Sequence, residues 1–352
     1  MSNLFYRDSP IIGLDISQTG IKVMSLDPKK WQILGYGSMD LDPTKMQRML
    51  DSKDEAYLSK SLAQLLEKQI VGSLGGSHVV IGVPTSRSYS RTFSIPAKAA
   101  TSLRDAVELE VDQYIPVPLQ SLYLDYEVIE RTKDTITAVM AAVPKEVVNV
   151  CIAAAEQVGL LPIMIEPSIN ATARVLKRTE GADLPTLIVD IGNTDTDIAV
   201  LDGGVIRVTG AAPVGGNTFT LNIAKKLGVE LENAHQLKVL NGLSPGPRQQ
   251  KIKSALDPSL KKIVTEILKV IRYYNERLTD KRKIEQLLVV GGGSNVPGIG
   301  DYFTDSLVMP ARVASPWQQL NFGKLTEPAK QYRSRYIAVA GLASITGEEV
   351  FA

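Results

Sequence analysis

Two short segments of the chain combine an aspartate, an apolar run and a tight turn in a way that suits phosphate chemistry. They are residues 15–27 (DISQTGIKVMSLD) and residues 190–202 (DIGNTDTDIAVLD), and both predict strand, turn, strand. Backbone N–H groups in such turns can converge on an anion. A strand-end carboxylate is costly to bury alone, but two of them across a cleft can share a hydrated Mg²⁺ ion. We therefore expect Asp15 and Asp190 to hold Mg²⁺ through water.

The two segments also match each other. They align without a gap, five of their thirteen positions are identical, and they lie 175 residues apart in a chain of 352. Taken singly, each hairpin is better explained as an ordinary strand-end turn capped by aspartate. As a pair at half-chain spacing, they favour a duplicated fold that binds phosphate between its two halves.

Glycine turns supply two further candidate contacts. A predicted strand at residues 284–290 runs directly into residues 291–294 (GGGS), and three consecutive glycines permit close approach of the backbone to a base or a phosphate. This is not a Rossmann fingerprint, because position 296 is valine and the element does not open a βαβ unit; the chain also has no P-loop motif. Gly215 and Gly216 precede a predicted helix that ends near Gly228, and alone they would be a simple loop.

Composition excludes several other classes of protein. Lys and Arg number 39 against 38 acidic residues, so net charge gives no reason to expect nucleic acid or an anionic membrane as a partner. The single cysteine, Cys151, lies at a helix-like apolar position, which predicts a buried side chain and a reducing compartment. Neither His78 nor His235 has metal-ligand spacing. Because no long apolar window occurs, we expect a cytoplasmic protein of roughly two domains, with no segment inserted into the membrane.

Two aspartate hairpins and a strand–glycine turn, in this order, resemble the superfamily of actin, the heat-shock chaperones and the sugar kinases. There they form the phosphate 1, phosphate 2 and adenosine motifs. The resemblance implies an α/β fold of the actin-like, ribonuclease H-like type, duplicated, with ATP and Mg²⁺ in the cleft between the halves. Two helices would close the cleft, one beginning near Glu166 and one at residues 337–345, whose small residues would let them cross closely.

Residues 87–165 indicate one branch of this superfamily. They predict strand, helix, strand, strand, helix, strand, an α+β unit whose position is similar to the 1C subdomain of the PilM and FtsA families. Residues 114–118 (YIPVP), followed by residues 124–126 (LDY), resemble the PilM-type pattern. The chain as a whole thus resembles the PilM family of type IV pilus assembly proteins.

This resemblance implies a domain layout that covers the whole chain. Its parts would be subdomain 1A at residues 1–86, subdomain 1C at 87–165, a return to 1A at 166–185, domain 2 at 186–334 with an inserted 2B at about 225–275, and a closing helix at 335–352.

The residues that match the family's nucleotide motifs can be carried over one by one. Those expected to bind nucleotide are Asp15, Ser17, Gln18, Thr19, Lys22, Asn193, Thr194, Asp195, Gly215, Gly216, Lys238, Gly291, Gly292, Gly293 and Ser294. The chain departs from the family at His235, where a glutamate is usual. Glu166 is the one candidate for orienting water against the γ-phosphate, and the alternative is that it caps the following helix. Whether ATP is hydrolysed stays open.

The resemblance also implies a partner. We expect an ATP-binding scaffold of the pilus inner-membrane complex that docks the N-terminal cytoplasmic tail of PilN beside subdomain 1C. Residues 87–96, with two arginines, are the first candidate for that groove. The alternative is an FtsA-like actin homologue in cell division, against which we set the lack of a C-terminal amphipathic membrane helix. Self-association stays open.

Overall fold

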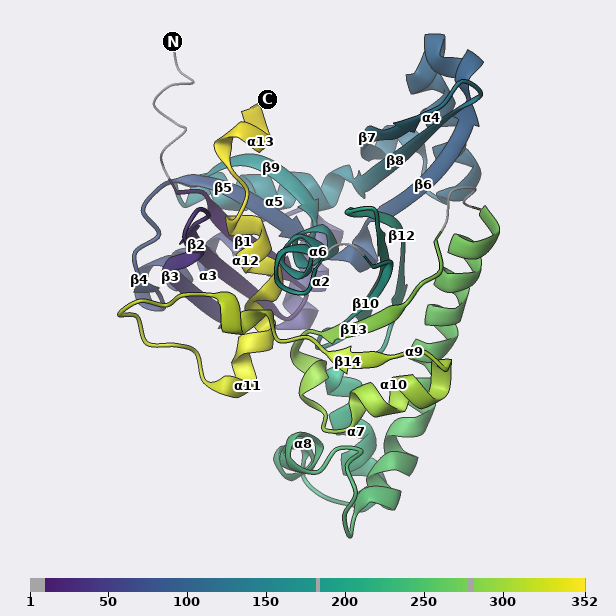
Figure 1. The fold of residues 1–352 in the computed structure, drawn as a ribbon. Coiled ribbons are helices and arrows are strands. Elements are labelled where there is room, and N and C mark those ends of the chain that lie inside the picture. The colour runs from purple at the N-terminus through teal and green to yellow at the C-terminus, as the bar shows by residue number, and fades with distance from the viewer. Residues whose placement is uncertain (1–9, 182–183, 278–281, 352) are drawn as a thin grey trace.

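The computed structural model describes residues 10–181, 184–277 and 282–351. It contains two α/β domains, each built on a sheet that begins with one of the aspartate hairpins (Figure 1). The sheet of domain I has the order β4-β3-β2-β1-β5-β9. Its strands are β1 (Ile12–Ser17), β2 (Gly20–Asp27), β3 (Gln32–Asp40), β4 (Val71–Gly72), β5 (His78–Val83) and β9 (Leu161–Pro167).

The sheet of domain II repeats this arrangement and is extended at one edge, in the order β14-β13-β10-β11-β12-β6-β8-β7. Its strands are β10 (Thr186–Ile191), β11 (Thr196–Asp202), β12 (Val205–Ala212), β13 (Gln286–Val290), β14 (Ala311–Val313), β6 (Tyr89–Pro96), β7 (Leu122–Arg131) and β8 (Thr135–Pro144). In each domain an antiparallel three-strand meander is followed by two parallel strands. The predicted duplicated, actin-like α/β fold is therefore confirmed.

Helices cover the outer faces of both sheets and fill the space between them. Those on domain I are α2 (Pro43–Ser52), α3 (Ala56–Lys68) and α5 (Lys145–Gln157); those on domain II are α7 (Gly216–Leu227), α8 (Leu231–Leu240), α9 (Gln249–Arg277) and α10 (Ile299–Leu307). The remaining helices are α4 (Leu103–Tyr114), α6 (Ser168–Thr179), α11 (Lys330–Arg333), α12 (Ile337–Ala343) and α13 (Gly347–Phe351). Helix α7 ends at Gly228, whose φ of 65° is the left-handed conformation that glycine adopts without strain.

Helices α6 and α12 cross between the two sheets (Figure 1). Their contact depends on a missing side chain, because a Cβ atom at Gly341 would collide with the carbonyl oxygen of Ala171. The close crossing that we expected from the small residues of 337–345 is confirmed. The crossing fixes α6, which follows the last strand of domain I, against α12, which follows the end of domain II.

The inserted unit is smaller than residues 87–165. Strand β9 pairs in parallel with β5, and α5 packs on α3, so residues 145–167 are part of domain I. Residues 89–144 form the rest, a three-stranded sheet covered by α4 with its own apolar core. Alternating hydrophobicity predicts a strand but not the sheet that it joins, which explains the difference. We refer to residues 89–144 as the 1C unit.

The 1C unit is attached to the sheet of domain II, not to that of domain I. One register pair, Val208 with Arg91, joins β12 to β6. The hydroxyl of Thr209 adds a hydrogen bond of 3.2 Å to the carbonyl of Ser90. The eight-stranded sheet therefore runs from domain II into the 1C unit through a narrow joint.

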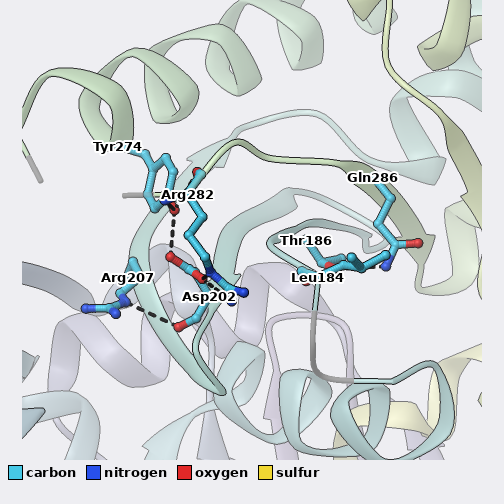
Figure 2. Close-up of polar contacts among 7 residues, drawn as sticks. All are labelled: Leu184, Thr186, Asp202, Arg207, Tyr274, Arg282 and Gln286. Carbon is cyan, nitrogen blue, oxygen red and sulfur yellow. Dashed lines mark hydrogen bonds and ion pairs between the residues drawn. The ribbon is translucent and has the colours of Figure 1, made fainter. Parts of the chain in front are cut away.

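The second copy of the repeat ends in a buried network that ties α9 to the end of β11 (Figure 2). The carboxylate of Asp202 accepts a 2.7 Å hydrogen bond from the Tyr274 hydroxyl and two bonds, of 2.8 and 2.6 Å, from the Arg282 guanidinium. Burial, and then the hydrogen bond to Asp202, raise the pKa of Tyr274 well above its ordinary value. The matching residue of the first copy, Asp27, lies in an exposed turn, where it accepts backbone N–H bonds and forms a 3.8 Å ion pair with Lys30.

Tyr274→Phe is expected to destabilise the protein by about 1–3 kcal/mol, because it removes a donor from a buried carboxylate without leaving room for water. The thermal unfolding midpoint, Tm, should fall by a few degrees. Tyr123→Phe is the matched control, since its hydroxyl makes an exposed hydrogen bond to Asn149. Equal Tm values for the two variants would show that the Asp202 network adds nothing to stability.

Candidate functional site

The turns of the two aspartate hairpins face each other across a cleft between domains I and II. The amide of Asn193 donates a 3.0 Å hydrogen bond to the hydroxyl of Thr19, which joins the two turns directly. Around this contact the cleft is lined by residues of both hairpins and of the glycine turn, including Asp15, Ser17, Thr19, Lys22, Asp190, Asn193, Thr194, Asp195, Gly291 and Gly292. The structure thus brings together segments that lie half a chain apart.

Asp15 is held in place by two partners in the first hairpin. Its Oδ2 atom lies 2.6 Å from the Nζ atom of Lys22, its register partner on β2. Its Oδ1 atom accepts a 2.8 Å hydrogen bond from the hydroxyl of Ser168, the first residue of α6. Because the carboxylate is buried and oriented on both sides, it presents a fixed negative charge to the cleft.

The second hairpin carries a like-charged pair at the same place. Asp190 faces Asp197 in the β10–β11 register, where the first hairpin has Asp15 facing Lys22. Burial, and then the charge of Asp15, raise the pKa of Asp190 to about 6; its Oδ2 atom accepts one hydrogen bond, of 3.2 Å, from Thr172. Burial raises the pKa of Asp197 well above its ordinary value, and its Oδ1 atom has no hydrogen-bond partner.

These carboxylates define the electrostatics of the cleft. Five aspartates, Asp15, Asp40, Asp190, Asp195 and Asp197, line it together with two cations, Lys22 and Arg335, so the local charge is negative. A hydrated divalent cation would supply the missing positive charge and the missing donor for Asp197. Among residues 10–181, 184–277 and 282–351, no three Asp, Glu, His or Cys side chains are placed to hold a metal ion directly.

The raised pKa of Asp190 makes stability depend on pH. The folded protein binds this proton more tightly than the unfolded chain, so the contribution of Asp190 to stability is largest below pH 3.8 and is lost as the pH rises to about 6. We expect the unliganded protein to lose stability relative to Asp190→Asn between about pH 4 and about pH 7. Thermal unfolding of both proteins across this range measures it. Asp27→Asn is the control, and a constant difference between wild type and Asp190→Asn would contradict the prediction.

Asp195 connects the cleft to the segment that enters the 1C unit. Its Oδ2 atom accepts a 2.6 Å hydrogen bond from the hydroxyl of Ser86, and Thr194 donates a 3.3 Å bond to its other oxygen. Ser86 lies on the 3₁₀ turn η1 (Thr85–Arg87), between β5 and β6. This end of the cleft is therefore joined to the segment that links domain I to the 1C unit.

The glycine turn after β13 closes tightly on the second hairpin. Gly291 has a φ of 80°, and a Cβ atom there would lie 2.6 Å from the carbonyl oxygen of Ile191 and would also collide with the Asp190 carboxylate. The hydroxyl of Ser294 donates a 2.7 Å hydrogen bond to the carbonyl of Gly291. Only glycine fits at 291, because any side chain would displace the carboxylate at the centre of the cleft.

A second cavity of about 690 Å³ continues from the first, a size typical of small-ligand sites. It is lined by Gly216, His235, Lys238, Gly292, Gly293, Tyr332 and Arg335, among others. Lys238 is buried and donates 2.9 Å hydrogen bonds to the carbonyl of Gly216 and the hydroxyl of Thr220. Burial, and then the charge of Arg335, lower its pKa to about 8. Burial, Lys238 and Arg335 likewise lower the pKa of His235.

Four of the residues expected at the site do not line either cavity. They are Gln18, Gly215, Ser294 and Glu166. Gly215 and Ser294 support residues that line the cavities. Gly215 packs on the Asn193 carbonyl, and Ser294 closes the glycine turn. Gln18 lies in the first hairpin turn, between β1 and β2.

Glu166 lies on β9, where its carboxylate forms a two-point ion pair with Arg174, at 2.8 and 3.0 Å. The same guanidinium donates a 3.0 Å hydrogen bond to the carbonyl of Gly341 on α12. Glu166 therefore supports the crossing of α6 and α12, and it lines neither cavity. Nor does it cap α6, whose N-cap residue is Pro167.

Several residues of the cleft lining were not predicted, among them Asp40, Ser168, Asp197 and Arg335. Asp197 occupies the position of Lys22 in the aligned repeat, so the alignment held a signal for it. The other three come from a strand end, a helix start and a loop outside the motifs, and no pattern in the sequence marks them.

The strand order and the facing hairpins define the class of proteins with the actin-like fold. Within it, the family model described as type IV pilus assembly protein PilM matches residues 13–345. The chain therefore belongs to the PilM family, which assigns it a role in type IV pilus assembly. None of the described helices is long and apolar enough to cross a membrane.

Solved structures show the same fold at low sequence identity. The chain is similar to a PilM–PilN type IV pilus biogenesis complex, with a TM-score of 0.77 and 21% identity over 95% of this chain and 97% of the other. It is also similar to MreB5 of Spiroplasma citri bound to ADP, with a TM-score of 0.54 and 13% identity over 95% of each chain.

Curated relatives match over parts of the chain. The cell division protein FtsA of Neisseria meningitidis serogroup B is 39% identical over 82 residues, which are 23% of this chain and 19% of that protein. FtsA of Escherichia coli K12 is 26% identical over 204 residues, 51% of this chain and 48% of that protein. The chain thus spans less than half the length of these relatives.

Proposed function

We propose that the cleft binds ATP, with the phosphates between the two hairpins and the adenosine in the second cavity. The observation that carries this proposal is the contact of the two turns through Asn193 and Thr19, flanked by carboxylates from both domains. Lys238 and Arg335 line the second cavity, and Gly292 borders both cavities. The ADP-bound MreB5 structure, which has the same fold, supports a nucleotide as the ligand.

The chain's own side chains fit a hydrated Mg²⁺ ion. Asp15 and Asp190 would hold it through water, and Asp197, whose Oδ1 atom lacks a partner, would accept a hydrogen bond from one of these waters. Bound Mg²⁺ would neutralise the charge that the nucleotide phosphates share with these aspartates. Lys22 would orient Asp15, and the backbone of the turns would meet the phosphates.

We further propose that the protein is a cytoplasmic scaffold that docks the N-terminal tail of PilN between domain I and the 1C unit. We place the groove away from residues 87–96, because β6 pairs with β8 along its length and with β12 at Arg91. A cavity of about 570 Å³ lies instead between α5 and the 1C unit, lined by Val117, Pro144, Lys145, Asn149 and Val150 among others. Its apolar floor and charged rim suit a short peptide. Membrane attachment would then come through the partner.

Binding of a synthetic PilN tail peptide to the full chain, followed by fluorescence anisotropy, tests the docking proposal. Asn149→Arg places a long side chain at the mouth of the cavity and should weaken binding about tenfold or more. Gln64→Arg, an exposed amide on α3 outside the cavity, is the matched control. Equal affinity of both variants for the peptide would reject this groove, and unchanged protection by ATP would show that both variants are folded.

A further inference from the structure

Arg91 occupies the narrow joint between β6 and β12. It forms the one register pair there, with Val208, so it lies where the 1C unit meets domain II. Its guanidinium carbon lies 4.3 Å from the ring centres of both Tyr114, on α4, and Tyr273, on α9. The side chain is therefore held flat between two aromatic rings from different parts of the molecule.

This cation has no counter-ion among the described residues. No carboxylate there forms an ion pair or a hydrogen bond with Arg91, and its Nη1 atom is shut off from solvent without an acceptor. Burying a guanidinium without an anion is unfavourable, and stacking on aromatic rings leaves its N–H donors unpaired. Arg174, another partly buried arginine, is paired with the carboxylate of Glu166.

A small pocket lies beside Arg91. Its volume is about 190 Å³, which is room for a tetrahedral anion with some water. Four hydroxyl side chains of η1, β6 and β12 line it, with no acidic residue: Ser86, Ser88, Ser90 and Thr209. In the cleft on the other side of η1, by contrast, five aspartates line the wall. The walls of the two neighbouring cavities therefore carry charge of opposite sign.

We propose that this pocket binds a small tetrahedral oxyanion of the phosphate or sulfate class. The anion supplies the counter-charge that Arg91 lacks and accepts a hydrogen bond from its Nη1 atom, which has no acceptor. Among the hydroxyls, Ser90 can donate to a second oxygen of the anion, because Ser86, Ser88 and Thr209 already donate to Asp195, to the Thr85 carbonyl and to the Ser90 carbonyl. Three units of the molecule contribute to the site: η1 follows β5 of domain I, Arg91 and Tyr114 belong to the 1C unit, and Thr209 belongs to domain II. The site is separate from the proposed ATP cleft and does not depend on it.

Thermal unfolding of the full chain at constant ionic strength, with inorganic phosphate replacing chloride and EDTA present, tests the proposal. Wild type should show a saturable rise in Tm, distinct from the linear stabilisation that phosphate gives any protein. Arg91→Gln should raise the half-saturating phosphate concentration about tenfold or more. Ser90→Ala removes the available hydroxyl, keeps the Arg91 stack, and should raise the half-saturating concentration about threefold. Arg104→Gln, an exposed arginine on α4, should match wild type.

A second series repeats the titration with Mg²⁺ and a saturating non-hydrolysable ATP analogue. The phosphate response should persist unchanged, because the pocket and the cleft are separate. A purely linear response in wild type, or loss of the saturable part when the analogue fills the cleft, would overturn the proposal. If Arg91→Gln fails to fold, Ser90→Ala carries the same test. Absence of any effect of the analogue would reject the ATP cleft and leave the oxyanion result standing.

Discussion

Asp190→Ala is expected to abolish the thermal protection that ATP gives in the presence of Mg²⁺. Asp190 lies at the centre of the cleft, and alanine removes the carboxylate through which waters of a Mg²⁺ ion would be held. Affinity should fall by about a hundredfold, the loss expected when a buried charge-assisted contact disappears. The unliganded variant should unfold at the same temperature as wild type or higher, because Asp190 and Asp197 no longer compete as buried like charges.

The rise in Tm with Mg²⁺ and ATP measures this effect, with ATP alone as the second condition. Asp190→Asn keeps the volume and the Thr172 contact, so it separates the loss of charge from the loss of packing. Asp27→Ala, a turn aspartate remote from the cleft, is the control for removing a carboxylate. An undiminished protection of Asp190→Ala would mean that the second hairpin is not a phosphate site.

Glu166→Ala is expected to lose stability but to keep its protection by ATP, the opposite of Asp190→Ala. It should lower the free energy of unfolding by roughly 2–4 kcal/mol, because it strands the Arg174 guanidinium at the crossing of α6 and α12. This loss of stability lies toward the low end of the range for a broken buried ion pair, because the Arg174 side chain is 28% exposed. Protection by Mg²⁺ and ATP should remain, because Glu166 lines neither cavity.

Denaturant unfolding of Glu166→Ala, Arg174→Ala and the double variant gives the coupling energy of the pair. A structural ion pair predicts that the double variant is no less stable than Glu166→Ala alone. The ATPase rate is the decisive second measurement. If Glu166→Ala kept its stability and lost a measurable ATPase activity, Glu166 would have to reach the γ-phosphate in a closed form of the protein, and its structural role would be wrong.

The sequence predicted the duplicated fold because both hairpins keep their spacing and turn chemistry. These signals are local: an aspartate, a turn or a glycine run lies next to the strand that it ends. Local sequence is enough to predict which residues stand at the end of a strand. The α6–α12 crossing was predictable for a similar reason, since a run of small residues at helical spacing is a signature of close helix contact.

Partners that meet only in the folded chain were not predictable. Glu166 and Arg174 come into contact because α6 turns back along β9. Their spacing in the sequence does not distinguish this ion pair from a catalytic carboxylate at position 166. Asp197 was overlooked because buried like charges are unusual, although its alignment with Lys22 was available. The 1C boundary was misplaced because strand pairing is a long-range choice, and β9 satisfies the same pattern in either sheet.

The joint between β6 and β12 has a mechanical consequence. Because the 1C unit is hydrogen-bonded to the sheet of domain II, it acts as a lever arm of that domain (Figure 1). The cavity beside α5 has one wall on this arm and the other on domain I. Any hinge rotation that narrows the cleft between the hairpins therefore also moves these two walls relative to each other. A ligand in the cleft and a peptide in the cavity beside α5 would therefore both respond to the angle between domains I and II.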